Sequence, residues 1–160
     1  RSLEPGETIY GFGFSPDSSF MLYQVYPGMG EGSLLYSVPP DGSGESQQVN
    51  DSPGAGEGVA NYRITASSDR VVYQAAQDHA GVYELYSAAI DGNGSAVKLN
   101  GPLVEGGYIE RFNISPDDSV VVYQADQDIK AVQELFASTL PDLPEPPDPE
   151  IMTFLPAIVR

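Results

Sequence analysis

The stretch Ile114–Leu140 reads ISPDDSVVVYQADQDIKAVQELFASTL, and related versions of it occur three times in the chain. Tyrosines followed by glutamine recur every 50 residues, at Tyr23, Tyr73 and Tyr123. The same offset relates Leu35, Leu85 and Leu135, and the register needs no gap from residue 9 to residue 140. A fixed period of this length is typical of repeat architectures, in which each repeat is one supersecondary unit packed on its neighbours.

Each repeat is predicted to form four short strands. The first strands are expected at 9–14, 59–64 and 109–114, and the latter two contain apolar–polar alternation, which indicates one buried face. The second strands (20–25, 70–75 and 120–125) have continuous apolar centres such as Val121-Val122-Tyr123, which predicts a strand covered by neighbouring sheets on both faces. The third strands are expected at 33–38, 83–90 and 133–140, and short fourth strands at 47–49 and 96–99.

Turn residues separate these strands. Ser15-Pro16-Asp17 and Ser115-Pro116-Asp117 follow two of the first strands, and proline with serine and aspartate favours a tight turn there. Asp41-Gly42 and Asp91-Gly92 predict hairpin turns that need a positive φ angle. The expected organisation is therefore all-β: blade-like four-stranded antiparallel sheets over residues 1–50, 51–100 and 101–140.

The end of the chain departs from the repeat. Residues 141–150 are rich in proline and are expected to form an extended linker. Residues 151–160 form an apolar, β-prone tail, predicted either to close the third repeat as a strand or to dock on another subunit. The apolar residues proposed for assembly are Ile151, Met152, Phe154, Leu155, Ile158 and Val159.

Four strands per repeat, with an apolar-x-Ser-Pro-Asp turn, Val-Val-Tyr, Glu-Leu-Tyr and Asp-Gly-Asn-Gly, resemble the TolB-like β-propeller repeat. The matching residues are Ile114–Asp117, Val121–Tyr123, Gln133–Phe136, Tyr83–Tyr86 and Asp91–Gly94. The resemblance implies that each repeat is one propeller blade, and that closed rings usually hold six or more. Three blades are too few for a ring, so an open array would leave two apolar faces exposed.

Composition excludes several partners. The 160 residues include 23 acidic and 7 basic side chains, for a formal charge of −16. This balance argues against nucleic acid and against anionic membrane surfaces, and no apolar run is long enough for membrane insertion. Cysteine is absent, which is compatible with an exported bacterial protein, and we expect the protein to be extracellular or at the cell surface. Because the chain begins with Arg1 rather than methionine, we expect it to be either processed or cut from a longer chain.

No catalytic or cofactor-binding motif is recognised, so the chain is predicted not to be an enzyme. The single histidine, His79, is expected in a surface loop, and zinc lacks ligands. Calcium is the metal for which partial ligand sets exist, at Asp126-x-Asp128 and Asp91-x-Asn93, although neither has a full calcium-loop spacing. Sequons at Asn50, Asn93 and Asn113 are candidate glycosylation sites, with the turn at Asn93 the most accessible.

Three functions stay open. The first is a non-enzymatic structural protein that self-associates into a ring or filament through open blade faces and the tail. The second is the C-terminal part of a larger propeller that binds a protein or glycan. The third is the propeller fragment of a hydrolase whose catalytic domain lies elsewhere.

Overall fold

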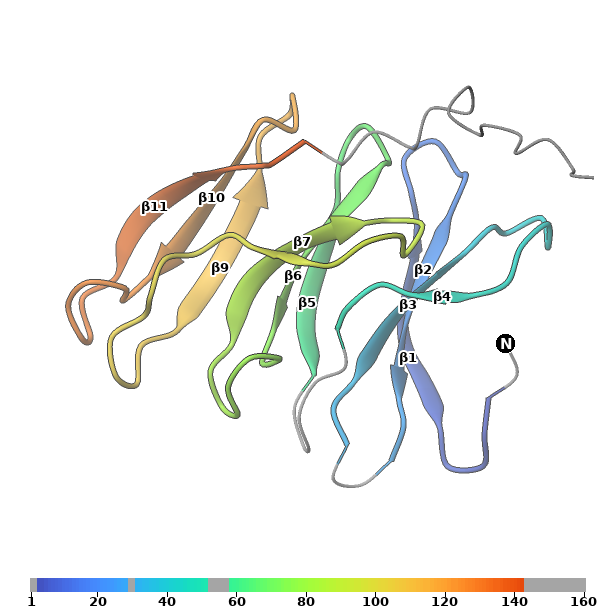
Figure 1. Ribbon diagram of the computed structural model, residues 1–160, viewed down its shortest axis with the longest axis horizontal. Coiled ribbons are helices and arrows are strands. Elements are labelled where there is room, and N and C mark those ends of the chain that lie inside the picture. The colour runs from blue at the N-terminus through green and yellow to red at the C-terminus, as the bar shows by residue number, and fades with distance from the viewer. Residues whose placement is uncertain (1–2, 29–30, 52–57, 143–160) are drawn as a thin grey trace, which may run out of the picture.

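Eleven β-strands in three antiparallel sheets make up the protein in the computed structural model, which describes residues 3–28, 31–51 and 58–142 (Figure 1). No helix occurs in this part of the chain, so the predicted all-β class is confirmed. A search for helices long and apolar enough to cross a membrane found none among the described residues.

Each sheet follows chain order from one edge to the other, with antiparallel neighbours. The first contains β1 (Thr8–Phe14), β2 (Met21–Tyr26), β3 (Leu34–Val38) and β4 (Gln47–Gln48). The second contains β5 (Val59–Ile64), β6 (Arg70–Ala75), β7 (Glu84–Ala89) and β8 (Val97–Lys98). The third contains β9 (Ile109–Ile114), β10 (Val120–Ala125) and β11 (Glu134–Thr139).

The third sheet has three described strands where four were predicted. Residues 147 and 148, which the 50-residue period aligns with β8, lie outside the described residues. The apolar tail at 151–160 and most of the proline-rich linker also lie outside them, so the predicted roles of both stay predictions.

The same strand register recurs in all three sheets. Aromatic residues face each other across the second and third strands and stack with ring centroids 5.6, 5.7 and 5.6 Å apart, in the pairs Tyr23–Tyr36, Tyr73–Tyr86 and Tyr123–Phe136. Such cross-strand aromatic pairs stabilise a sheet and fix its register. A register shift also recurs near the start of the first strand in each sheet, at Ile9/Gly11, at Val59/Asn61, and at Ile109/Arg111 opposite Gln124/Ala125 of β10.

Two apolar cores hold the three sheets together. In the first core, Leu22 and Leu35 of the first sheet lie with Val71, Tyr73 and other residues of the second. In the second core, Val72 and Leu85 lie with Tyr123, Phe112 and others of the third sheet. The side chains of Val71 and Val72 are both fully buried, one in each core, which confirms for β6 the prediction of a strand covered on both faces. The same prediction is wrong for β10, where Val122 is 41% exposed because the third sheet stands at the end of the row.

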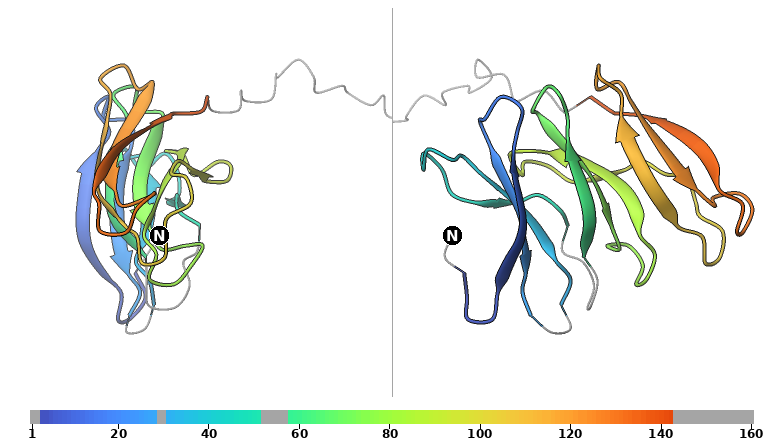
Figure 2. Two further views of the ribbon diagram at one scale, coloured as in Figure 1. Left: turned by 90° about the vertical axis from the view of Figure 1, so that its left-hand side faces the viewer. Right: turned by 180° about the vertical axis from the view of Figure 1, so that it is seen from behind.

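The sheets lie side by side in a row, with the second between the first and third (Figures 1 and 2). Among the described residues, the row therefore has two end faces without a neighbouring sheet. We call the outer face of the first sheet, with Phe12, Met21 and Tyr23, the leading face. The outer face of the third sheet, with Val122, Gln124 and Leu135, is the trailing face.

Loops and turns are sorted to opposite edges of the row. The β1–β2, β5–β6 and β9–β10 turns lie at the upper edge in Figure 1, and the β6–β7, β8–β9 and β10–β11 connections lie at the lower edge, here called the loop edge. The upper turns contain Ser18, Ser68 and Asp118, all with positive φ (63°, 65° and 56°). The predicted hairpin glycines Gly42 and Gly92 also adopt positive φ, at 76° and 73°.

Candidate functional site

A hollow of about 500 Å³ lies at the loop edge, between the β6–β7 loop and the segment that leads from β8 to β9. We call it the loop-edge hollow. Its lining combines polar side chains with a short apolar surface and a glycine turn: His79, Val82, Glu84, Lys98, Asn100 and residues 102–107. This size falls within the usual range for small-molecule pockets, about 300–1,000 Å³.

An ion cluster forms the floor of this hollow. The Lys98 ammonium lies 2.8 Å from both carboxylate oxygens of Glu84 and 2.8 Å from Oδ2 of Asp78. Glu84 is buried, and its Oε2 accepts a further hydrogen bond from the Tyr86 hydroxyl at 3.3 Å. Asn100 connects the cluster to the sheet, because its Oδ1 accepts the N–H of Leu85 at 2.7 Å while its Nδ2 lies 3.4 Å from Oε1 of Glu84.

The protonation states of the cluster follow from these contacts. The hydrogen bond from Lys98 lowers the pKa of Asp78. Burial on its own would lower the pKa of Lys98, but its hydrogen bonds to Asp78 and Glu84 outweigh burial and raise that pKa. Burial, followed by the charges of Glu84 and Asp78, raises the pKa of Tyr86. Lys98 and Tyr86 therefore keep their protons at neutral pH, and act here as hydrogen-bond donors rather than as bases.

One of the two lysines of the chain lines this hollow and the other lies beside it. Besides Lys98 in its floor, Lys130 places its ammonium beside Gly106, so close that a Cβ added to that glycine would lie 3.2 Å from Nζ. The only histidine of the sequence, His79, lines the same hollow from the exposed β6–β7 loop, as predicted for its position. In a chain with few cations, two basic side chains thus line one hollow and a third lies beside it.

Among the described sheets, only the second contains this ion cluster. The positions that correspond to Glu84 and Lys98 in the first sheet are Leu34 and Gln48. Our sequence analysis did not predict the cluster. A signal was nevertheless present, because Lys98 pairs with Tyr86 across β7 and β8, and Glu84 lies two residues from Tyr86 on the same face.

The residues considered for calcium use their oxygens elsewhere. Asp126 accepts the N–H of Tyr108 at 2.6 Å and that of Ala131 at 3.2 Å, so its carboxylate anchors the β10–β11 loop. Asp91 accepts both the N–H and the side-chain amide of Asn93, at 2.9 and 2.8 Å. Within the described residues, no group of three or more His, Cys, Asp or Glu side chains is arranged to hold a metal ion.

The three sequon asparagines have different surroundings. Asn93 is exposed in the β7–β8 turn, and Asn113 is exposed on β9. Asn50 is buried, with its Oδ1 accepting the N–H of Leu35 at 2.7 Å and its Nδ2 donating to the carbonyl of Asp51 at 2.8 Å. Asn93 and Asn113 are thus both more exposed than Asn50, and glycosylation itself stays a prediction.

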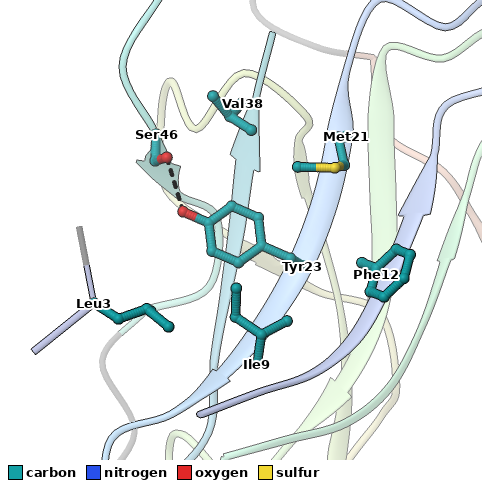
Figure 3. A pocket seen from close by; sticks show the side chains of 7 residues that line it. All are labelled: Leu3, Ile9, Phe12, Met21, Tyr23, Val38 and Ser46. Carbon is teal, nitrogen blue, oxygen red and sulfur yellow. Dashed lines mark hydrogen bonds between the residues drawn. The ribbon is translucent and has the colours of Figure 1, made fainter. Parts of the chain in front are cut away.

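A second hollow, of about 550 Å³, lies on the leading face (Figure 3). Its lining is mainly apolar, formed by Leu3, Ile9, Phe12, Met21, Tyr23, Val38 and Ser46. Figure 3 shows Tyr23 between Ile9 and Ser46, with its hydroxyl donating to Oγ of Ser46 at 2.8 Å. Phe12 is 74% exposed although it lies on a sheet face. Such a surface is suited to packing another apolar surface rather than to chemistry.

Two solved structures share this fold. One is an oligogalacturonate lyase in complex with manganese, matched with a TM-score of 0.57 at 20% identity over 89% of this chain and 38% of that one. The other is an oligogalacturonate lyase from Vibrio parahaemolyticus, matched with a TM-score of 0.56 at 17% identity over 87% of this chain and 37% of that one. The chain thus spans less than two fifths of the length of either structure.

These matches support a propeller-like β fold and leave the TolB-like character of the repeats as a prediction. No protein-family model matches the sequence, and no curated protein matches it either. The prediction that the chain is not an enzyme is wrong against these comparisons, because both matched structures are oligogalacturonate lyases. The described residues do not supply a ligand set for the manganese of the first structure.

Proposed function

We propose that this chain supplies three consecutive blades to a larger β-propeller that binds acidic oligosaccharides at its loop edge and cleaves them by elimination. The observation that carries the proposal is that Lys98 and His79 line one hollow of an otherwise acidic chain, with Lys130 beside it at Gly106. The larger ring is supported by the matched structures, which are more than twice as long, and by the uncovered end faces of the row.

The hollow offers complementary groups for a sugar acid. The exposed Lys130 would pair with a carboxylate, and Val82 and Leu103 provide apolar surface for the C–H face of a sugar ring. The charge of Lys98 is already balanced by Glu84 and Asp78, so Lys98 would donate hydrogen bonds and hold the floor in place. Since the whole chain carries a charge of −16, long polyanions are repelled and short oligosaccharides are favoured.

In the elimination, a base removes the proton next to the carboxylate and a cation stabilises the negative charge that develops there. The carbon–carbon double bond forms as the glycosidic carbon–oxygen bond at the neighbouring carbon breaks, and the departing sugar oxygen takes the bonding electron pair and a proton from water. Lys130 would provide the cation. Because Lys98 and Tyr86 retain their protons, His79 is the described residue of the hollow that we propose as the base.

Calorimetric titration tests the binding step. We expect a trisaccharide of galacturonate to bind more tightly than the matching trisaccharide of galactose, which differs by lacking the carboxylates. Lys130→Met should weaken binding of the acid about tenfold, equivalent to about 1.4 kcal/mol. Arg111→Met removes the same charge from an exposed position on β9, outside the hollow, and should leave the affinity unchanged. Equal affinity for both sugars, or no effect of Lys130→Met, would contradict the proposal.

The elimination step has a separate readout. Cleavage creates a carbon–carbon double bond in the product, which is followed by ultraviolet absorbance. His79→Ala should reduce the rate of product formation while the affinity for the galacturonate trisaccharide stays within about twofold, because a base acts in the transition state rather than in binding. A loss of affinity with an unchanged rate at saturation would assign His79 to binding instead.

A further inference from the structure

Adjacent sheets are joined by a hydrogen bond that repeats with the 50-residue period. Nε2 of Gln24 donates to the carbonyl of Val59 at 2.9 Å, and Nε2 of Gln74 donates to the carbonyl of Ile109 at 2.7 Å. In both cases a glutamine on the second strand of one sheet reaches the first strand of the next sheet. This contact therefore defines how one sheet docks on the sheet that follows it.

A second repeated contact joins the turns at the upper edge. The N–H of Asp17 donates to Oγ of Ser68 at 3.1 Å, and the N–H groups of Ala66 and Ser67 donate to the two carboxylate oxygens of Asp118 at 2.9 and 2.7 Å. In each pair of turns, the number of N–H donors equals the number of acceptor oxygens. The first turn has proline at residue 16, which has no N–H, and meets a single hydroxyl, whereas the second turn presents two N–H groups to a carboxylate.

The third sheet carries the same contact groups with no following sheet in the row. Oε1 of Gln124 accepts a hydrogen bond from Nε of Arg111 at 2.8 Å, and Nε2 is the atom that reaches the next sheet at the equivalent positions. Leu135 and Val122 are 76% and 41% exposed, whereas their equivalents in the other two sheets are fully buried. The turn at Pro116-Asp117 has the proline of the first turn, so its geometry calls for a single hydroxyl acceptor.

The leading face of the first sheet has the matching groups. Ile9 occupies the position of the two carbonyl acceptors Val59 and Ile109, and Ser18, which is exposed, occupies the position of Ser68 and Asp118. The apolar hollow in Figure 3 lies on this face beside Phe12 and Met21. The leading face thus offers a carbonyl, a hydroxyl and an apolar hollow. These are the three features that the contact groups of the trailing face require in a partner.

We propose that the trailing face of one copy of this chain docks on the leading face of a second copy. In this interface Gln124 donates to the carbonyl of Ile9, the N–H of Asp117 donates to Ser18, and Leu135 packs into the apolar hollow beside Phe12. The interface continues the two docking contacts that already join the sheets within one copy. This interface rests on the proposed larger propeller and identifies a second copy of the chain as the source of its next blade. It does not depend on carbohydrate binding.

Such an interface joins two different surfaces, so it closes only if the rotation between copies permits. Two copies joined by two such interfaces form a closed dimer, and one interface per copy forms an open chain. Since each copy carries a charge of −16, association should strengthen as added salt screens the repulsion.

Sedimentation velocity measures the association as the protein concentration and salt are raised. We expect wild type to form dimers or longer chains, and Leu135→Asp to raise the dissociation constant about thirtyfold, because it places a charge in the apolar centre of the interface. Ile129→Asp is the matched control, since Ile129 is 59% exposed in the β10–β11 loop and does not line the trailing face. A wild-type monomer at all concentrations overturns the proposal, as does association that both variants weaken equally.

Two further variants test the polar contacts without disturbing the fold. Gln124→Glu retains the acceptor for Arg111 and removes the donor for Ile9, and Ser18→Gly removes the hydroxyl at a position whose positive φ suits glycine. Each should weaken association about fivefold and leave the urea-unfolding midpoint of the monomer unchanged. Association that neither variant affects overturns the assigned geometry. Failure of this interface leaves the galacturonate titration interpretable, because Lys130 and His79 lie at the loop edge.

Discussion

The second and third sheets contain nearly the same strands in different surroundings. Both contain a Val-Val-Tyr-Gln-Ala segment followed by a Glu-Leu-aromatic segment, with the same cross-strand register. Leu85 is fully buried between sheets, whereas Leu135 is 76% exposed. The strand pattern therefore specifies which side chains can be buried, and the presence of a neighbouring sheet decides whether they are.

Truncation of these two leucines tests the difference most strongly. Leu85→Ala should lower the free energy of unfolding by about 2–5 kcal/mol, because it removes a fully buried side chain and leaves a cavity between two sheets. Leu135→Ala should change it by less than about 0.5 kcal/mol, as is usual for an exposed side chain. Urea unfolding followed by circular dichroism measures both values on dilute protein.

Dilution matters because association would bury Leu135. A cost for Leu135→Ala that grows with protein concentration would show that a second copy covers the trailing face. Equal costs for the two variants at the lowest concentration would mean that the third sheet is covered within a single chain, contrary to the arrangement described above.

The two glutamates that precede these leucines give a smaller contrast. Glu84→Gln keeps the size of a buried side chain but removes one of the two carboxylates that bind Lys98, so we expect a loss of about 1–3 kcal/mol. Glu134→Gln changes an exposed side chain and should have an effect below about 0.5 kcal/mol. The same urea experiment compares them, and equal losses would show that the ion cluster contributes nothing to stability.

The period and the strand order were predictable because alternation, apolar runs and turn residues act locally. The bounds of β5, β6, β9 and β10 agree with the expected ranges, and each of the other strands differs by one residue at one or both ends. The ion cluster was harder to predict. Glu84 and Lys98 are 14 residues apart, and their contact depends on the pairing of β7 with β8. The turn residues indicated that these strands pair, but they did not identify which residues face each other.

The hollow at the loop edge depends on still longer-range packing. Lys130 lies in the β10–β11 loop, whereas Gly106 lies in the segment between β8 and β9. No sequence spacing therefore predicts that the two lysines lie near each other. The contacts of the upper turns were equally hidden, because Ser68 and Asp118 act on backbone N–H groups of the preceding sheet and adopt positive φ without being glycine. Sequence reasoning therefore succeeded within a repeat and failed at contacts between repeats.

The smallest difference is expected between the β1–β2 and β9–β10 turns, which contain Ser-Pro-Asp, and the rest of the chain. Hydrogen bonds from the N–H of Ser19 and the hydroxyl of Ser15 lower the pKa of Asp17 to about 2, and those from Ser115 and Ser119 lower the pKa of Asp117 to about 2, from an ordinary value of 3.8. A carboxyl with a lowered pKa in the folded state adds stability above its ordinary pKa, and that contribution is lost as the pH falls toward the folded value.

We therefore expect the urea midpoint of wild type to fall between about pH 4 and pH 2. Asp117→Asn should make this fall shallower, because asparagine retains an acceptor for Ser115 and Ser119 but does not titrate. Asp142→Asn removes the same charge from an exposed position outside the turns and should leave the slope unchanged. If both variants alter the slope equally, the acid sensitivity comes from the overall charge of the chain rather than from the Ser-Pro-Asp turns.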